Sequence, residues 1–394
     1  MNKIERILII ILDGVGIGEL PDASRFGDEG SHTLGNIADH VGGLELPNLE
    51  KMGLGNIAAI KGLKPQPLPA ACFGKMAEVS PGKDSTTGHW EIGGIHLDSD
   101  FPYYPNGFPI HILDKFTQLT GRGVLGNKPA SGTEIIKELG EEHINTGKLI
   151  VYTSADSVYQ IAAHEEIVPV DELYRICEIA RNILTGEDAV ARVIARPFIG
   201  DNPENFTRTR GRRDFSLKPT RPTMLNLVQD AGIKTIGIGK IDDLYAGQGL
   251  DVKLHSKSNL QGIKLILEEL KKEKHALIMV NLVDFDMLWG HRNNVQGFYN
   301  ELLAFDRRLP EILDLIDEKT VLFLTADHGN DPTTASTDHA REYVPLLVYG
   351  AGIKSGINLG IRHTFADLGR TVTDIFGSTP TQSGTSFWNK IKKE

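Results

Sequence analysis

The sequence contains little cysteine, no excess of positive charge and no long apolar run. Its two cysteines, Cys72 and Cys177, lie far apart without a C-x-x-C pair, which argues against a disulfide framework or a thiolate zinc site. The formal net charge is −10, so we expect neither a nucleic-acid partner nor an anionic membrane partner. The apolar run at residues 7–12 is shorter than a signal-peptide core or a membrane span, so we expect a cytoplasmic protein.

The composition is that of an ordinary globular chain with a sizeable core. Hydrophobic residues make up 40% and charged residues 24% of the sequence. The length of 394 residues fits two or three domains, or one large α/β domain that carries an insertion.

Short apolar runs rich in Ile, Val and Leu alternate with segments of helical periodicity. The runs show no polar alternation, which is typical of parallel strands buried on both faces. The alternation therefore predicts an α/β fold with a doubly wound, mostly parallel sheet. The expected strands are 7–12, 235–239, 276–282, 321–325 and 344–349, and the expected helices are 223–230, 259–272, 297–317 and 364–376, with Asn259 capping the second.

Residues 100–218 interrupt this alternation. A proline- and aromatic-rich stretch at 101–109 opens the segment, and a helix expected over 171–184 is followed by a basic stretch at 192–218. We therefore predict a core made of residues 1–99 and 219–394, with residues 100–218 inserted as a second domain. The strands before and after the insert should then share one sheet.

Acidic and imidazole side chains follow three of the expected strands. Because ligands bind at the carboxyl ends of strands in open α/β sheets, these residues should meet at one edge. A lone aspartate there is as often a helix cap, and a lone histidine is more often structural. Together they suit two Mn²⁺, Zn²⁺ or Fe²⁺ ions, which can clamp a phosphoryl group. They are Asp13 after the first run, Asp284, Asp286 and His291 after the third, and Asp327, His328, Asp338 and His339 after the fourth.

A hydroxyl-rich turn is the second sign of chemistry. Ser85, Thr86 and Thr87 stand in a row between Gly82 and Gly88. A hydroxyl is a weak nucleophile unless a base or a metal activates it. Alone, the segment fits a polar loop that caps a helix; beside a two-metal site it favours a nucleophile.

These motifs, in this order, resemble those of bacterial phosphopentomutases, members of the alkaline phosphatase superfamily. The resemblance runs from residue 2 to about residue 388 and includes insert motifs at 126–134, 152–157, 164–166 and 205–208. The sequence DHGN at 327–330 alone would indicate only the superfamily, whereas the insert motifs select the mutases. The resemblance implies an alkaline phosphatase-like core with an inserted α/β cap domain.

The resemblance also implies roles for individual residues. One ion would be held by Asp13, Asp327 and His328, and the other by Asp286, His291 and His339. Ser85 would accept the phosphoryl group, at a position where the family usually has threonine; Thr86 is the alternative acceptor. The implied cofactors are two divalent ions, with Mn²⁺ favoured, and an activating sugar bisphosphate such as glucose 1,6-bisphosphate.

Five further residues are expected to bind the substrate. Ser154 and Asp156 would bond to sugar hydroxyls, Arg192 and Arg208 would hold the phosphate distant from the metals, and Lys240 would lie on the core side of the cleft. Arginine suits this task because its planar fork matches phosphate oxygens. Each of these charges also fits a solvated surface position or a structural ion pair.

The implied reaction interconverts (deoxy)ribose 1-phosphate and (deoxy)ribose 5-phosphate through a phosphoenzyme and a 1,5-bisphosphate. Its partners would be small sugar phosphates. The residues alone leave three alternative functions open. They are a metal-dependent phosphatase or phosphonoacetate-type hydrolase, a cofactor-independent phosphoglycerate mutase, and a non-catalytic protein that binds metals or sugar phosphates.

Overall fold

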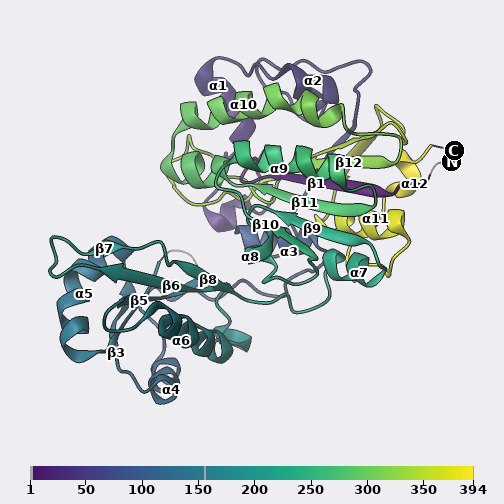
Figure 1. Ribbon diagram of the computed structural model, residues 1–394. Helices are drawn as coiled ribbons and strands as arrows, with labels where there is room; N and C mark the ends of the chain where they lie inside the picture. The colour runs from purple at the N-terminus through teal and green to yellow at the C-terminus, as the bar shows by residue number, and fades with distance from the viewer. Residues whose placement is uncertain (1–2, 155–156, 394) are drawn as a thin grey trace. The chain divides into compact units, whose positions relative to one another are not determined.

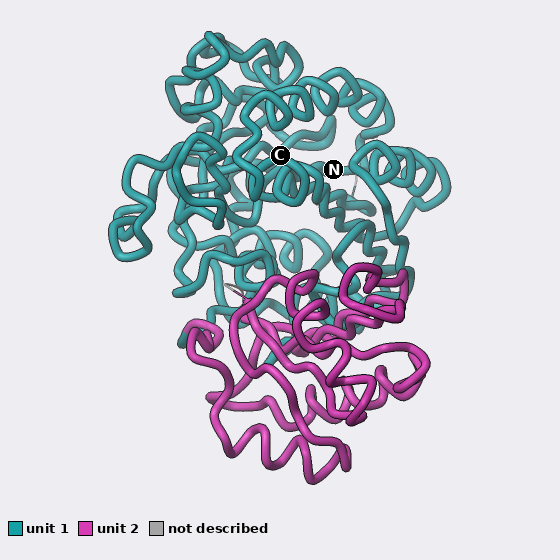
Figure 2. The backbone as a smooth tube through the Cα atoms, turned by 90° about the vertical axis from the view of Figure 1, so that its left-hand side faces the viewer, with its two compact units in different colours: residues 1–99, 219–394 teal, residues 100–218 magenta. Residues whose placement is uncertain are grey.

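The computed structural model describes residues 3–154 and 157–393, and its contacts divide the chain into two compact units. Unit 1 comprises Met1–Ser99 and Pro219–Glu394, and unit 2 comprises Asp100–Lys218 (Figure 2). Each unit has its own sheet. Within the described ranges, no helix has the length and apolar character needed to cross a membrane.

Unit 1 is built on an eight-stranded sheet in the order β10-β9-β11-β1-β12-β13-β2-β14. Neighbours from β10 to β12 are all parallel, which confirms the expected α/β fold with a mostly parallel sheet. Strands from before and after unit 2 lie in this one sheet. The bounds are β1 (Arg6–Leu12), β2 (Cys72–Met76), β9 (Lys234–Ile238), β10 (Val252–Leu254), β11 (Ala276–Leu282), β12 (Thr320–Thr325), β13 (Val344–Tyr349) and β14 (Asn358–Arg362).

Strand β13 departs from the parallel arrangement that its apolar run predicts. It is antiparallel to both β12 and β2. No α-helix or 3₁₀ helix separates β12 from β13. A parallel connection requires a long crossover, usually helical, so the chain instead returns antiparallel beside β12.

Helices cover both faces of the unit 1 sheet (Figure 1), and the central strands β1 and β11 are buried at every position. On one side, α10 packs against α1, α2 and α9; on the other, α11 packs against α3, α7 and α12. The bounds are α1 (Thr33–Val41), α2 (Pro47–Met52), α3 (Ser85–Ile92), α7 (Met224–Asp230), α8 (Ile241–Leu244), α9 (Asn259–Lys272), α10 (Val295–Leu313), α11 (Ala366–Phe376) and α12 (Trp388–Ile391).

The expectation that Asn259 caps α9 is wrong. The cap is Ser258, whose hydroxyl accepts a hydrogen bond from the backbone N–H of Gln261 at 3.3 Å. Asn259 is the first helical residue, and its side-chain oxygen accepts instead from the N–H of Asp284 at 3.0 Å. The side chain of Asn259 therefore makes a tertiary contact with Asp284, and Ser258 makes the local capping hydrogen bond.

Unit 2 has a six-stranded sheet in the order β3-β4-β5-β6-β7, with β8 also paired to β6. Helices α4 and α6 pack on one face around Phe116, Tyr159 and Ile176. Helix α5 packs on the other face around Ile135 and Phe198. The bounds are β3 (Val124–Pro129), β4 (Leu149–Thr153), β5 (Val158–His164), β6 (Arg192–Ile199), β7 (Thr207–Arg208), β8 (Arg213–Ser216), α4 (Ile110–Thr120), α5 (Gly132–Thr146) and α6 (Val170–Ile183).

Short helical turns complete the described chain. Four are 3₁₀ turns, and the fifth, η4, is a π-helical turn directly after β11. They are η1 (Ala23–Phe26), η2 (Leu54–Asn56), η3 (Gly186–Asp188), η4 (Phe285–Trp289) and η5 (Gly290–Arg292).

Candidate metal centre

Three adjacent parallel strands of unit 1 deliver acidic residues to one edge of the sheet. Leu12 at the end of β1 pairs with Leu282 of β11, and Ile11 pairs with Thr325 of β12. The chain therefore leaves all three strands at the same level. Asp13 follows β1 directly and Asp327 follows β12 after one residue; both are fully buried, and Asp286 lies 3% exposed in the π-turn η4.

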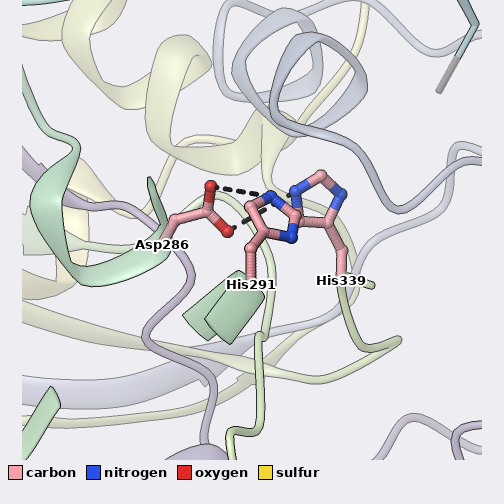
Figure 3. A group of neighbouring side chains, drawn as sticks. All are labelled: Asp286, His291 and His339. Carbon is pink, nitrogen blue, oxygen red and sulfur yellow. Dashed lines mark ion pairs between the residues drawn. The ribbon is translucent and has the colours of Figure 1, made fainter. Parts of the chain in front are cut away.

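Asp286, His291 and His339 form the first group of side chains suited to a metal ion (Figure 3). The Nε2 atom of His291 lies 3.1 Å from Oδ2 of Asp286, and Nε2 of His339 lies 3.5 Å from Oδ1. The other ring nitrogen of His291 lies 2.7 Å from the carbonyl oxygen of Thr337. That contact fixes the ring so that Nε2 faces the carboxylate, as is usual for metal-binding histidines.

Asp13, Asp286 and His328 form the second group, whose ligand atoms lie within 4.8 Å of one another. The Nε2 atom of His328 is 3.2 Å from Oδ1 of Asp13. Asp286 belongs to both groups, so a single carboxylate joins them into one centre. The expected division into two separate sets of three residues did not include this sharing.

Asp327, expected beside Asp13 and His328, also reaches the centre. Its Oδ2 lies 3.4 Å from Nε2 of His328, and its Oδ1 accepts from the N–H of Gly14 at 3.2 Å. Oδ2 of Asp327 and Oδ1 of Asp13 are buried, and among the described residues they make no well-aligned hydrogen bond, although imidazole nitrogens of His89 and His328 lie close to them. Buried carboxylate oxygens are costly without compensation, so this donor set fits divalent cations.

Electrostatic coupling within the centre is strong. Burial disfavours the charged carboxylate of Asp286, but His339 and His291 outweigh it and hold its pKa well below the usual range. Burial likewise disfavours the imidazolium of His291, but Asp286 outweighs it and raises that pKa to about 9. Since only neutral imidazole binds a metal, a divalent ion must displace protons from this centre.

Helix α3 begins at Ser85 and carries the hydroxyl-rich turn. Asp84 caps the helix, accepting from the N–H groups of Thr86 at 2.9 Å and Thr87 at 3.2 Å. Thr87 also donates its hydroxyl proton to Asp84. Ser85 instead has its Oγ 3.2 Å from Nε2 of His328, so it is the hydroxyl that the described contacts join to the centre.

Two buried residues of the centre, His89 and Asn281, received no role from the sequence. Asn281 donates from Nδ2 to Oδ2 of Asp13 at 2.8 Å, and the same atom lies 3.3 Å from Nε2 of His89. Two features of the sequence could have pointed to these residues. His89 lies one helical turn beyond Ser85, and Asn281 is the polar residue in an otherwise apolar strand. Asp284, a strand-end carboxylate, instead accepts from the N–H of Asn259 at 2.7 Å.

A buried arginine braces the segment before Ser85. Nη1 of Arg341 donates to the carbonyl oxygens of Ser80 at 2.7 Å and Gly82 at 2.6 Å, and to Oε2 of Glu78 at 2.8 Å. Arg341 is 2% exposed and follows His339 by two residues. The segment that carries His339 is therefore tied to the turn that carries Ser85.

The five expected substrate residues fall into separate places. Lys240 follows β9, whose carboxyl end lies at the same sheet edge as those of β11 and β1. Ser154 follows β4 in unit 2, and Asp156 lies outside the described residues. Arg192 begins β6, whereas Arg208 pairs with Phe198 near its other end. At about 3.3 Å per residue these two arginines start from opposite ends of the strand.

Comparison with known proteins identifies the family of this chain. The sequence model of the metalloenzyme superfamily matches residues 5–380. A phosphopentomutase from Dictyoglomus thermophilum is 59% identical over 389 residues, covering 99% of each chain. The chain belongs to the phosphopentomutase family. Another member, from Clostridium novyi, is 55% identical and covers 99% of this chain and 100% of its own.

Membership of the phosphopentomutase family makes the chain an enzyme of the isomerase class that acts as a phosphomutase. The superfamily is one of metalloenzymes, and its match agrees with the two groups that share Asp286. Both findings support divalent metals at this centre. A solved structure of a Pyrococcus horikoshii protein, 17% identical, superposes with a TM-score of 0.51 and covers 96% of this chain and 98% of its own, which shows similarity of fold alone.

Proposed function

We propose that the chain interconverts (deoxy)ribose 1-phosphate and (deoxy)ribose 5-phosphate, with Ser85 as the phosphoryl acceptor. The observation that carries this is the Ser85 hydroxyl, 3.2 Å from Nε2 of His328 and 6% exposed, beside a carboxylate–imidazole centre. The names of the curated relatives supply the pentose phosphate substrate. A hydroxyl is a weak nucleophile until a base or a metal activates it, and Ser85 lies beside residues suited to hold a metal.

In the proposed reaction, phosphorylated Ser85 donates its phosphoryl group to the free hydroxyl of the substrate. The resulting 1,5-bisphosphate reorients, and Ser85 takes up the other phosphoryl group, which releases the isomer. The N-terminal end of α3 favours the added negative charge at Ser85. When bound, divalent cations at the two groups would neutralise phosphoryl oxygens and activate the hydroxyl.

The proposal includes the cofactors and the location. The mixed Asp/His donor set suits Mn²⁺, and a sugar bisphosphate such as glucose 1,6-bisphosphate would load the first phosphoryl group. We further propose a cytoplasmic enzyme whose partners are small sugar phosphates and neither nucleic acid nor membrane. The net charge of −10 supports that choice.

We propose that Ser154, Asp156, Arg192 and Lys240 contact the sugar phosphate. The strand pairing in unit 2 supports a role for Arg192 near Ser154. The backbone N–H of Arg192 donates to the carbonyl oxygen of Ser157 at 3.3 Å, and Ser157 is close in sequence to Ser154. Arg208 was expected to share a phosphate with Arg192. Its position at the other end of β6 favours a separate role.

The test is conversion of ribose 1-phosphate to ribose 5-phosphate with Mn²⁺ and a catalytic amount of glucose 1,6-bisphosphate. Ser85→Ala should lower kcat by about 10³-fold or more, while Thr86→Val should keep most activity. Ser85→Thr, which restores a hydroxyl, should recover part of the loss. Equal activity of the wild type and Ser85→Ala would refute the acceptor.

The products of the same assay separate the alternatives. Release of inorganic phosphate without ribose 5-phosphate would indicate a phosphatase. Turnover of a three-carbon phosphoglycerate in place of the pentose phosphate would indicate a phosphoglycerate mutase. Phosphorus label that never mixes between substrate molecules would contradict the bisphosphate route.

A further inference from the structure

Asn330 lies against the carboxylate that both groups of candidate ligands share. Its side chain is 1% exposed, and its Nδ2 donates to Oδ1 of Asp286 at 2.6 Å. An ionised carboxylate only accepts hydrogen bonds, so the nitrogen of the amide faces it. The amide oxygen has no hydrogen-bond partner in the described part of the chain. The described hydrogen bonding of this side chain is therefore directed at Asp286.

The backbone of Asn330 is fixed by the start of helix α1. Its N–H donates to Oγ1 of Thr33 at 3.1 Å, and Thr33 is the fully buried first residue of the helix. The Thr33 hydroxyl donates in turn to Oε1 of Glu342 at 2.7 Å, and Glu342 is 1% exposed. Buried hydrogen bonds therefore link Glu342 through Thr33 to Asn330, and so to the shared carboxylate. A satisfied buried network of this kind holds its members in one arrangement.

Two glycines leave room for the Asn330 side chain. A Cβ at Gly290 would stand 2.5 Å from both Cγ and Nδ2 of Asn330, and a Cβ at Gly14 would stand 3.0 Å from its Cβ. The backbone at Gly290 is right-handed helical, with φ −58° and ψ −64°, so the closeness of Asn330 is the constraint there. Gly14 directly follows Asp13. Gly290 directly precedes His291. The amide is thus packed between two segments that carry candidate ligands.

The two oxygens of Asp286 face different histidines (Figure 3). Oδ2 lies 3.1 Å from Nε2 of His291, and Oδ1 lies 3.5 Å from Nε2 of His339. Rotation of the carboxylate about its Cβ–Cγ bond would displace both contacts, and it would also break the hydrogen bond from Asn330. The amide therefore holds the plane of the carboxylate.

We propose that Asn330 is a positioning residue whose amide fixes the carboxylate of Asp286, so that this carboxylate serves both groups of candidate ligands. Partners that orient metal ligands typically contribute about 10- to 100-fold to metal affinity or activity. The inference rests on the metal centre of the proposed function. It depends neither on Ser85 nor on the pentose phosphate substrate.

The first test is the Mn²⁺ affinity of the full chain, stripped of metal and titrated in competition with a fluorescent chelator, alongside steady-state kinetics. Asn330→Ala should weaken Mn²⁺ binding by about tenfold or more and lower kcat, with a smaller change in KM for ribose 1-phosphate. The matched control is Asn48→Ala. It removes an amide that donates to Oδ2 of Asp306 at 3.1 Å, and Asp306 belongs to neither group of candidate ligands. This control should bind Mn²⁺ as the wild type does.

Gly290→Ala tests the same contact from the other side. The added methyl group would take the place of the Asn330 amide, so this variant should resemble Asn330→Ala in Mn²⁺ affinity and in kcat. In the Asn330→Ala background the methyl group has room, and Gly290→Ala should then cause little further loss. Two independent effects would instead multiply in the double variant.

Four outcomes decide the inference. A folded Asn330→Ala protein that binds Mn²⁺ as tightly as the wild type would overturn it, and so would multiplied losses in the double variant. Circular dichroism and thermal unfolding in EDTA establish folding. If Asn330→Ala does not fold, Gly290→Ala decides, because wild-type Mn²⁺ affinity in that protein would also overturn the inference. A wild type that binds no Mn²⁺ would overturn the inference together with the metal centre.

The proposed reaction can fail separately. A wild type that binds Mn²⁺ but yields no ribose 5-phosphate would refute the pentose phosphate reaction alone. The Mn²⁺ titration of Asn330→Ala would still decide the role of Asn330, since it needs no sugar phosphate.

Discussion

Nδ1 of His89 lies 3.0 Å from Oδ2 of Asp327, and both side chains are fully buried. The same nitrogen lies 2.8 Å from the carbonyl oxygen of Ser85. On its other side, His89 meets Asn281, which donates to Asp13. One imidazole thus joins the helix of the proposed acceptor to the two aspartates on neighbouring strands.

We expect His89→Ala to lower kcat about 10- to 100-fold, because groups that orient metal ligands typically contribute that much. His89→Asn, which keeps a donor near the position of Nδ1, should lose less. The measurement is steady-state kinetics together with the metal content of the purified protein. His275→Asn, on an exposed histidine next to β11, is the control. Full activity of His89→Ala would contradict a positioning role.

Asp286 is shared by both groups of candidate ligands, so its loss should affect both ions. We expect Asp286→Asn to bind substantially less of both metals, whereas His291→Gln should mainly lose one. Elemental analysis of metal-loaded protein after dialysis measures this directly. Asp98→Asn, on a side chain 94% exposed, should retain the wild-type metal content. If His291→Gln lost both ions and Asp286→Asn neither, the shared carboxylate would be wrong.

Arg341 holds the turn before Ser85 through the carbonyl oxygens of Ser80 and Gly82. Arg341→Lys keeps the charge but cannot reproduce the planar fork, so the turn should shift. We expect kcat to fall about tenfold or more with a smaller change in KM, because displacement of a reacting group costs rate. Arg362→Lys, on an arginine bound to Asp367 at 2.7 Å in the same unit, is the matched control. Equal losses in both variants would indicate a merely structural effect.

Glu342 should make the stability of the protein fall as the pH rises. Burial raises the pKa of this carboxyl to about 8, although Thr33 and Gly18 donate hydrogen bonds to it. An unfolded chain releases this proton near pH 4.5, so between that value and about pH 8 the folded state binds more protons. The free energy of unfolding therefore decreases with rising pH in that window.

The matched variant for this prediction is Glu342→Gln, which removes the titration and keeps the shape. We expect its free energy of unfolding, measured by urea titration at several pH values, to change less between pH 5 and 8 than that of the wild type. Parallel pH profiles for the two proteins would contradict the assignment.

The residues at the strand ends show which features of the fold and the site the local sequence pattern could predict. Apolar runs that are followed by Asp13, by Asp284 and Asp286, and by Asp327 predicted both a parallel sheet and acidic groups at one edge, because burial on two faces requires unbroken apolar sequence. The same pattern could not predict whether β13 runs parallel or antiparallel to its neighbours, because a buried strand of either kind has the same apolar sequence. It also gave Asn259 a local cap that a tertiary contact to Asp284 replaced.

The sequence by itself determined the fold class, the family and the residue types gathered after the strands, since these depend on apolar periodicity and on motif order along the chain. Tertiary structure alone decided that Asp286 serves both groups, that His89 and Asn281 connect the aspartates, and that Arg192 and Arg208 lie apart. Those facts depend on strand register and side-chain direction across distant segments, and no spacing along a single chain encodes which side chains end up within hydrogen-bond distance.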